Sequence, residues 1–263
     1  NGESQKISKL LLKKNTLIDL SADFRLKKTS DFLKWYKIKH SASNMIKNSI
    51  YALPEIKRNK IKNKKIISCP GCYPTSILLP LIPLLKKRLI SNNNIIIDSK
   101  SGYSGAGRGV HKKYIRKNLY ESLSAYGIAN HRHNSEIQQE LDLCSGKKNN
   151  FHFTPHLTPM FRGILSTIYI DLIKGVTKNK INSVLNKYYK KEIFVSIAKP
   201  DTLLSTNDVI NTNNCIISVC KSKHRRKLII LSVIDNLIKG GSGQAIQNMN
   251  ILYNFKENEG LNV

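Results

Sequence analysis

The sequence has no long apolar run and few cysteines, and each shortage excludes a class of protein. Its longest apolar stretches, TSILLPLIPLL and KLIILSVI, are well short of the ~20 residues that a membrane-spanning helix needs, so we expect no membrane association. Five cysteines are an odd number for a disulfide framework, and the chain opens with no export signal. We therefore expect reduced thiols and a cytoplasmic location.

Acidic residues are also scarce: 17 Asp and Glu stand against 44 Lys and Arg, which gives a formal net charge of +27. Such a charge is typical of proteins that bind nucleic acids or anionic membranes. Only nine of the 44 cations are arginine, however, and the lysines accompany Asn and Ile in runs such as KRNKIKNKKII, as AT-rich codons favour. Arginine is the side chain that pairs bidentately with phosphates and bases. We therefore interpret the charge as a solvated surface and expect no nucleic acid as partner.

The pattern along the chain changes near Phe151. Before it, helical and strand-like segments alternate, with a short strand over 16–20 and a strand, tight turn and helix through SCPGCYPTS at 68–76. After it, five segments of strand length surround one helical segment, VTKNKINSVLNKYYKK, and the chain closes with a glycine loop and a helix. This order predicts an α/β first part, followed by a largely antiparallel sheet with helices on one face.

Cys72 is the first candidate for chemistry. It follows the Pro70-Gly71 turn and precedes an apolar helix that we predict to begin near Thr75. A thiol at this place faces unpaired N–H groups and the positive end of the helix dipole, and both lower its pKa. The pattern favours a catalytic thiol. A redox pair with Cys69, half of a zinc site and a structural cysteine remain alternatives, although no second Cys-x-x-Cys is present and we expect no metal.

Two histidines form the second candidate group. His131 and His133 precede a helical segment for which Asn134 or Ser135 is the expected cap. An imidazole, with its ordinary pKa of about 6.5, suits general acid/base chemistry beside a thiol. The alternative is a pair of loop histidines that only pack or cap.

Two glycine loops, SKSGYSGAGRG and KGGSGQAIQ, each follow a predicted strand. Small residues allow backbone N–H groups to approach a phosphate or a nicotinamide closely, but neither loop has a full G-x-G-x-x-G pattern. Arg25, Arg108 and Arg162 lie in predicted loops and offer bidentate donors for an acyl phosphate or a carboxylate. Solvent exposure is the alternative for each arginine.

Seven segments together resemble one family in their order along the chain. They are LIDLSADFRL, YALPEI, CPGCYPT, KSGYSGAGR, HRHNSEI, FTPHLTPMFRGI and NLIKGGSGQAIQNMN. They resemble the N-acetyl-γ-glutamyl-phosphate reductases, NADP-dependent enzymes of arginine biosynthesis that are related to aspartate-semialdehyde and glyceraldehyde-3-phosphate dehydrogenases. The resemblance extends from about Asn1 to Val263.

The resemblance implies an enzyme that reduces an acyl phosphate, N-acetylglutamyl 5-phosphate, to its 5-semialdehyde with NADPH and releases inorganic phosphate. It also implies a homo-oligomer, either a dimer or a tetramer. A sister enzyme that acts on aspartyl or aminoadipyl phosphate is one alternative. A non-enzymatic basic protein that binds nucleic acid, with an affinity that falls steeply with salt, is the other.

The resemblance also implies roles for individual residues. Cys72 would be the nucleophile that forms a thioester, and His131 the acid/base, with His133 as the alternate and as a substrate-side residue. Cys69 stands where the family has Asn, so we expect it to be a bystander, although an inactivating link to Cys72 stays open. The remaining implied contacts are Arg108 and Arg162 to substrate, and Ser101, Gly102, Ser104, Gly105, Asn236, Gly240 and Gly241 to the cofactor.

The fold that the resemblance implies has three parts. They are an incomplete Rossmann-type NADP-binding domain over 1–71, an α+β catalytic and oligomerisation domain with a mixed sheet over 72–242, and a helix over 243–263 that returns to the first domain. The family opens with a strand, a glycine-rich loop and a helix that hold the pyrophosphate, and this chain starts after them, at Asn1 rather than Met. We therefore expect a part of a longer enzyme, with a degraded gene as the alternative, and weak NADP binding by these 263 residues alone.

Overall fold

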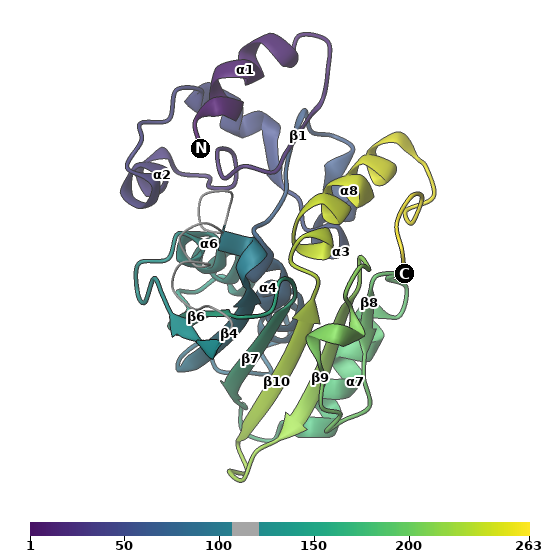
Figure 1. Ribbon diagram of the computed structural model, residues 1–263. Helices are drawn as coiled ribbons and strands as arrows, with labels where there is room; N and C mark the ends of the chain where they lie inside the picture. The colour runs from purple at the N-terminus through teal and green to yellow at the C-terminus, as the bar shows by residue number, and fades with distance from the viewer. Residues whose placement is uncertain (107–120) are drawn as a thin grey trace.

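A computed structural model describes residues 1–106 and 121–263 and shows two sheets, one above the other in Figure 1. The smaller sheet has three parallel strands in the order β1-β3-β2, and the predicted strand over 16–20 is confirmed as β1. Parallel strands need crossover connections, and helices supply them here. Its elements are α1 (Glu3–Leu11), β1 (Leu17–Asp19), α2 (Thr29–Tyr36), β2 (Ser49–Tyr51), α3 (Pro54–Ile61) and β3 (Ile66–Ser68).

The larger sheet has seven strands in the order β5-β6-β4-β7-β10-β9-β8. It is mixed: β4 pairs with β6 and β8 with β9 in parallel, while the other neighbours are antiparallel. The strands predicted beyond Phe151 are therefore confirmed. The seven strands of this sheet are β4 (Ile95–Gly102), β5 (Ser124–Ala125), β6 (Phe151–Thr158), β7 (Ile164–Asp171), β8 (Val195–Ile197), β9 (Cys215–Lys221) and β10 (Lys227–Ile234).

Helices cover one face of the larger sheet, as the sequence predicts. They are α4 (Cys72–Lys86), α6 (His133–Ser145) and α7 (Lys178–Tyr189), and their apolar side chains form the main core with alternate residues of the strands. The last helix, α8 (Gly243–Tyr253), leaves the larger sheet and packs against α3 and β1 beside the smaller one (Figure 1). No helix in the described ranges is long and apolar enough to cross a bilayer.

Two helices begin earlier than predicted. The helix expected to start near Thr75 starts at Cys72, because the Thr75 hydroxyl donates to the Gly71 carbonyl from inside the first turn. The helix with Asn134 or Ser135 as expected cap starts at His133, because the Ser135 hydroxyl also donates to a carbonyl instead of accepting from an N–H group. Both differences place chemistry-bearing residues at the first position of a helix.

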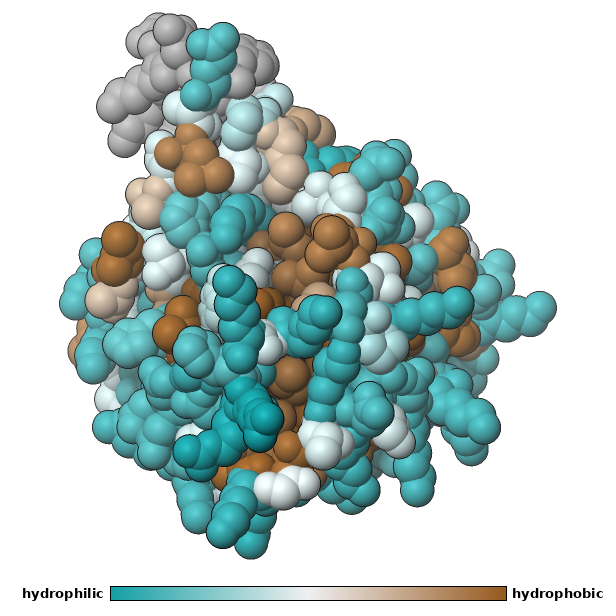
Figure 2. All heavy atoms as spheres, turned by 90° about the horizontal axis from the view of Figure 1, so that it is seen from below, coloured by the Kyte–Doolittle hydropathy of each residue, from teal (hydrophilic) through white to brown (hydrophobic). Residues whose placement is uncertain are grey.

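The second face of the larger sheet carries an exposed apolar row. Ile96 of β4 lies opposite Tyr169 of β7, and Tyr169 lies opposite Ile229 of β10. Ile96 and Tyr169 are each 41% exposed. Elsewhere the surface is mainly polar: seen from below, hydrophilic side chains cover most of the molecule and apolar surface shows between them (Figure 2). The row is therefore unusual for a chain so rich in lysine, and an exposed apolar row of this kind is typical of a surface that contacts another protein.

Helix α4 contains two prolines in its interior, Pro80 and Pro83, yet it continues to Lys86. Proline has no N–H group, so Pro83 cannot donate to the Leu79 carbonyl one turn earlier. The Tyr189 hydroxyl, from α7, donates to that carbonyl at 2.5 Å instead. Burial raises the pKa of Tyr189 well above its ordinary value, so this donor keeps its proton at any ordinary pH.

We therefore predict that Tyr189→Phe lowers the free energy of unfolding by about 1–3 kcal/mol, since it leaves the Leu79 carbonyl buried and unpaired. In a Pro83→Ala background the alanine N–H can serve that carbonyl, so Tyr189→Phe should cost less there. Urea denaturation of the two single variants and the double variant measures this coupling. Equal costs in both backgrounds would contradict it.

Candidate active site

Cys72 is the first residue of α4, directly after β3 and its turn, and its side chain is half-buried. Burial raises the pKa of Cys72 to about 11, although the backbone N–H of Tyr73 and the charge of Arg25 act to lower it. The sequence-based prediction of a lowered pKa is therefore wrong, because burial outweighs the helix N-terminus. At neutral pH the thiol keeps its proton, so a nucleophilic role requires a proton acceptor.

Cys69 lies in the core and not in the site. It has no exposed surface, and burial raises its pKa to about 12. The Asn248 side chain, from α8, lies 3.8 Å from the Cys69 sulfur as a weak donor. All five cysteines of the chain are described and carry free thiols.

A buried carboxylate, Glu136 of α6, organises the backbone that precedes Cys72. It is fully buried and accepts hydrogen bonds from the Gly71 N–H at 3.0 Å, Arg25 Nη1 at 3.0 Å and the Tyr51 hydroxyl at 3.2 Å. It thereby joins two side chains from the smaller sheet to the turn that carries Cys72. We did not predict a role for Glu136 from the sequence, although it lies within the HRHNSEI segment that supports the resemblance.

Arg25 is not available as an anion-binding residue. Its side chain is buried, pairs with Glu136 and donates through Nη2 to the Leu20 carbonyl at 2.7 Å. The option of a substrate contact from Arg25 is therefore wrong, because this guanidinium serves the interior.

His133 lies directly against the turn before Cys72. A Cβ atom on Gly71 would come within 2.4 Å of His133 Nε2, so only glycine fits there. The same Nε2 lies 3.7 Å from Glu136 Oε1. Nδ1 of His133 is buried and has no hydrogen-bond partner among the described residues. This ring is therefore held beside the turn with one nitrogen unused.

His131 lies next to His133, with the ring centroids 4.8 Å apart, and packs edge-on against Tyr73, Tyr126 and Phe153. Its Nδ1 accepts a hydrogen bond from the backbone N–H of His133 at 3.2 Å. In the neutral ring the proton therefore resides on Nε2. Burial lowers the pKa of His131 to about 3, with a smaller electrostatic contribution from the His133 ring, and burial also lowers the pKa of His133. Both rings are neutral at pH 7.

The two glycine loops converge, as the resemblance implies. Asn236, after β10, accepts from the Gly163 N–H at 2.6 Å and donates to the Ser104 hydroxyl at 3.0 Å. A Cβ atom on Gly105 would lie 3.1 Å from Ser101 Oγ and 3.3 Å from Asn236 Nδ2. These residues of the two loops therefore pack closely against one another at the ends of β4 and β10.

Two further glycines are required by close approach. A Cβ atom on Gly240 would lie 2.6 Å from the Cβ atom of Cys72, and one on Gly102 would lie 2.5 Å from the Phe161 carbonyl oxygen. Gly241 has non-helical backbone angles, with φ −156° and ψ −107°, and has more space. The second loop therefore touches Cys72 directly through Gly240.

The two predicted substrate arginines have different outcomes. Arg162 Nη1 lies 3.3 Å from Asp235 Oδ2, a fully buried carboxylate, and also donates to Asn211. It thus stands beside the second loop, already paired but partly exposed. Arg108 lies outside the described residues.

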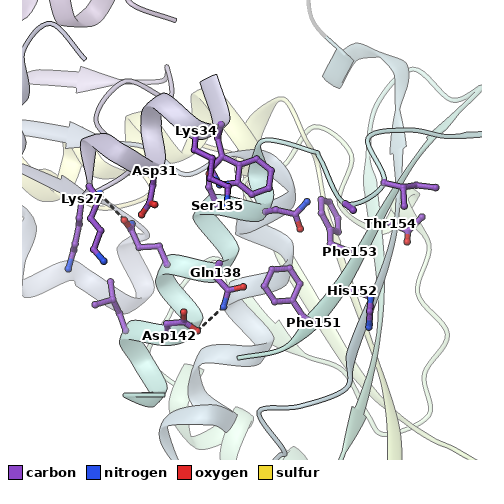
Figure 3. Close-up of a pocket in the computed structure, with 17 residues that line it drawn as sticks. Lys27, Asp31, Lys34, Ser135, Gln138, Asp142, Phe151, His152, Phe153 and Thr154 are labelled. Carbon is purple, nitrogen blue, oxygen red and sulfur yellow. Dashed lines mark hydrogen bonds between the residues drawn. The ribbon is translucent and has the colours of Figure 1, made fainter. Parts of the chain in front are cut away.

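A cavity of about 620 Å³ lies on another side of α6. Figure 3 shows Lys27, Asp31 and Lys34 facing α6 and the β6 side chains Phe151 and Phe153 across it. Neither Cys72 nor either histidine of the site lines this cavity, so it is not the candidate active site. Within the described ranges, no three His, Cys, Asp or Glu side chains are grouped to hold a metal ion.

Residues 72–236 match the family model for the semialdehyde dehydrogenase dimerisation domain. The chain is 44% identical to N-acetyl-gamma-glutamyl-phosphate reductase of Desulforamulus reducens over 99% of this chain and 76% of that protein. It is 46% identical to the enzyme of the same name from Vesicomyosocius okutanii, over 97% of this chain and 74% of that one.

Among solved structures, it is similar in fold to aspartate semialdehyde dehydrogenase II from Vibrio cholerae. The TM-score is 0.69 at 16% identity, over 96% of this chain and 77% of that one. The residues that surround Cys72 thus lie in a chain that is more than 40% identical to two reductases of the same name. The chain belongs to the N-acetyl-gamma-glutamyl-phosphate reductase family of semialdehyde dehydrogenase-like oxidoreductases.

Proposed function

We propose that the protein reduces N-acetylglutamyl 5-phosphate to N-acetylglutamate 5-semialdehyde in arginine biosynthesis. The observation that carries the proposal is the half-buried thiol of Cys72 at the first position of α4, directly after Gly71, against which His133 packs, and in contact with Gly240. Similarity to reductases of this name over nearly the whole chain supports the substrate. Sister enzymes that act on aspartyl or aminoadipyl phosphate would share the thiol and differ in substrate contacts.

Semialdehyde dehydrogenase-type oxidoreductases use a nicotinamide cofactor, and we propose NADP(H). The arrangement of the two loops supports a cofactor site, because the hydrogen bond from Asn236 to the Ser104 hydroxyl joins them and Gly240 of the second loop touches Cys72. Ser101, Gly102, Ser104 and Gly105 would hold it from one side, and Asn236, Gly240 and Gly241 from the other. When bound, the reduced cofactor supplies the hydride.

In the proposed first half-reaction, the sulfur of Cys72 attacks the acyl carbon of the substrate, and the thiol proton passes to the departing phosphate. The carbon–sulfur bond forms as the carbon–oxygen bond to phosphate breaks, and inorganic phosphate leaves with the electron pair. Because its raised pKa keeps the Cys72 thiol protonated at neutral pH, we propose that the proton is removed only as substrate arrives. His133, with Nδ1 unpaired beside the turn, is the proposed substrate-side residue.

In the second half-reaction the thioester carbonyl is reduced, and its oxygen needs a hydrogen-bond donor and then a proton. We propose His131 for this role, because its Nδ1 accepts from the backbone and leaves the Nε2 proton to offer. As the carbon–sulfur bond breaks and the aldehyde leaves, the hydroxyl returns its proton to His131, and the Cys72 thiolate takes up a proton from solvent. We propose that Arg162 contacts the substrate. Arg108, which lies outside the described residues, is the second proposed substrate contact.

The family model that matches 72–236 is a dimerisation domain, and we propose that the protein forms a homodimer or homotetramer. The apolar row of Ile96, Tyr169 and Ile229 on the larger sheet is the proposed contact, since sheet faces bury such rows against a second sheet or a second copy. Free thiols throughout suit a reducing compartment such as the cytoplasm.

The mechanism predicts that Cys72→Ser loses phosphate-dependent reduction of NADP by N-acetylglutamate semialdehyde by about 10³-fold or more, because a serine hydroxyl does not replace the thiol. The matched control, Cys69→Ala, should stay within a few-fold of the parent, because Cys69 is a core residue. The assay uses the protein from its complete gene. Full activity of Cys72→Ser would refute the mechanism, and activity only with aspartate semialdehyde would favour the sister enzyme.

The raised pKa of Cys72 predicts an unusual pH dependence for the thiol of the unliganded protein. A pKa of about 11 means that the reactive thiolate is scarcer at pH 7 than for an ordinary cysteine. The rate of Cys72 alkylation by iodoacetamide should therefore rise by about tenfold per pH unit through pH 8 to 10. Peptide mapping of the alkylated protein gives this rate. A plateau below pH 8 would show that the helix N-terminus outweighs burial after all.

The apolar row predicts that Tyr169→Glu weakens self-association, because a carboxylate would be buried without a partner. Sedimentation velocity should show a smaller species than the parent protein at the same concentration. Tyr253→Glu, which changes an exposed aromatic residue of α8, is the matched control and should leave the assembly intact. An unchanged species in Tyr169→Glu would place the subunit contact elsewhere.

A further inference from the structure

Lys239 is the only lysine that is buried in the ranges that the structure describes, and its side chain has no exposed surface. A buried ammonium group is costly unless it is paired and hydrogen-bonded. Its Nζ donates to the equally buried carboxylate of Glu55 and to Gln247 Oε1 at 2.8 Å, and lies 5.4 Å from the centroid of the Phe194 ring. Burial acts to raise the pKa of Glu55, but Lys239 and Gln247 outweigh it and lower the pKa, so this carboxyl group is ionised.

The backbone beside Lys239 contacts the proposed nucleophile. Lys239 and Gly240 belong to a π-helical turn, Ile238–Ser242, between β10 and α8. A Cβ atom on Gly240 would lie 2.6 Å from the Cβ atom and 3.0 Å from the Cα atom of Cys72. The turn therefore fills one side of Cys72 with its backbone alone.

Hydrogen bonds also connect this turn to the helix that carries Cys72. Gln244 Nε2 donates to the Lys239 carbonyl at 2.8 Å and to Thr75 Oγ1 at 3.0 Å. Thr75 in turn donates to the Gly71 carbonyl at 3.0 Å. The charged pair thus anchors the turn to α3 through Glu55, and the amide of Gln244 anchors it to the first turn of α4.

We propose that Lys239 is a positioning residue for Cys72: paired with Glu55, it holds the glycine turn against Cys72 and so restricts the thiol to its open side. Lys239 does not reach the reacting atoms itself, because its Nζ is occupied by Glu55 and Gln247. The expected effect of losing this pair on turnover rests on the proposed function, whereas its expected effect on the accessibility of the Cys72 thiol does not.

The test replaces the charge by a side chain of similar length. Lys239→Met leaves Glu55 buried and unpaired and can fail to fold, so the decisive variant is Lys239→Met/Glu55→Gln, which removes both charges. We expect Cys72 in the folded double variant to react with iodoacetamide at pH 7 about tenfold faster, because the turn no longer covers it. We expect kcat to fall by about tenfold to a hundredfold, with KM less affected, because the thiol is misplaced.

Two other cysteines distinguish positioning from general loosening. Cys69 and Cys215 have no exposed surface, so each reports on unfolding within the same alkylation experiment. A positioning role predicts that Cys72 alone becomes more reactive. Measurement of all thiols by peptide mapping in one sample makes the comparison independent of protein concentration.

Lys57→Met is the matched control variant. Lys57 lies on α3, as Glu55 does, and its Nζ is 3.2 Å from Glu140 Oε2, but it makes no contact with the glycine turn. This variant loses the Lys57–Glu140 ion pair, in which Lys57 comes from the same helix as Glu55. Its Cys72 reactivity and its kcat should match those of the parent.

The inference is overturned if the folded double variant has the parent's Cys72 alkylation rate and kcat. It is also overturned if Cys69 and Cys215 accelerate together with Cys72, since the pair would then stabilise the whole fold and not the turn. If the parent protein shows no turnover of the proposed substrate, the proposed function fails, and the alkylation rates still decide the role of Lys239.

Discussion

The site depends on the pairing of one buried carboxylate. Glu136 has no exposed surface, and a lone carboxylate there would cost on the order of several kcal/mol. Arg25 and Tyr51 from the smaller sheet and the Gly71 N–H supply its hydrogen bonds. Glu136 belongs to α6 on the larger sheet, whereas Arg25 follows β1 and Tyr51 lies in β2, so the carboxylate is satisfied only when the two sheets are correctly placed. The turn that carries Cys72 is thereby tied to the overall fold.

A second buried charge repeats this arrangement on the other side of Cys72. Lys239 belongs to the turn after β10 and its partner Glu55 to α3, which packs beside the smaller sheet. Cys72 thus lies between two backbone turns, each held by a buried ion pair. The other described lysines all have exposed surface, where an ion pair does little to hold the backbone in place. The two buried pairs, in contrast, fix the positions of the turns beside Cys72.

Crowding of the backbone explains the glycines of the site. Gly71 accommodates the His133 ring, and Gly240 accommodates Cys72 itself. The same crowding buries the thiol and the imidazoles, which raises the pKa of Cys72 and lowers that of His131. The unliganded site is therefore almost uncharged at its reacting groups. In the mechanism that we propose, the thiolate therefore forms only when substrate binds.

The sequence by itself determined the class of fold and the family. Alternating apolar residues predicted β7 and β10, and the Pro70-Gly71 turn before an apolar segment predicted a helix just after Cys72, because these signals are local. Only the tertiary structure decided the pKa of Cys72 and the use of Arg25, which pairs with Glu136 across 111 residues. It also decided that Lys239 is buried, against a partner 184 residues away. Burial and long-range pairing depend on which surfaces meet, and no local pattern in the chain encodes that.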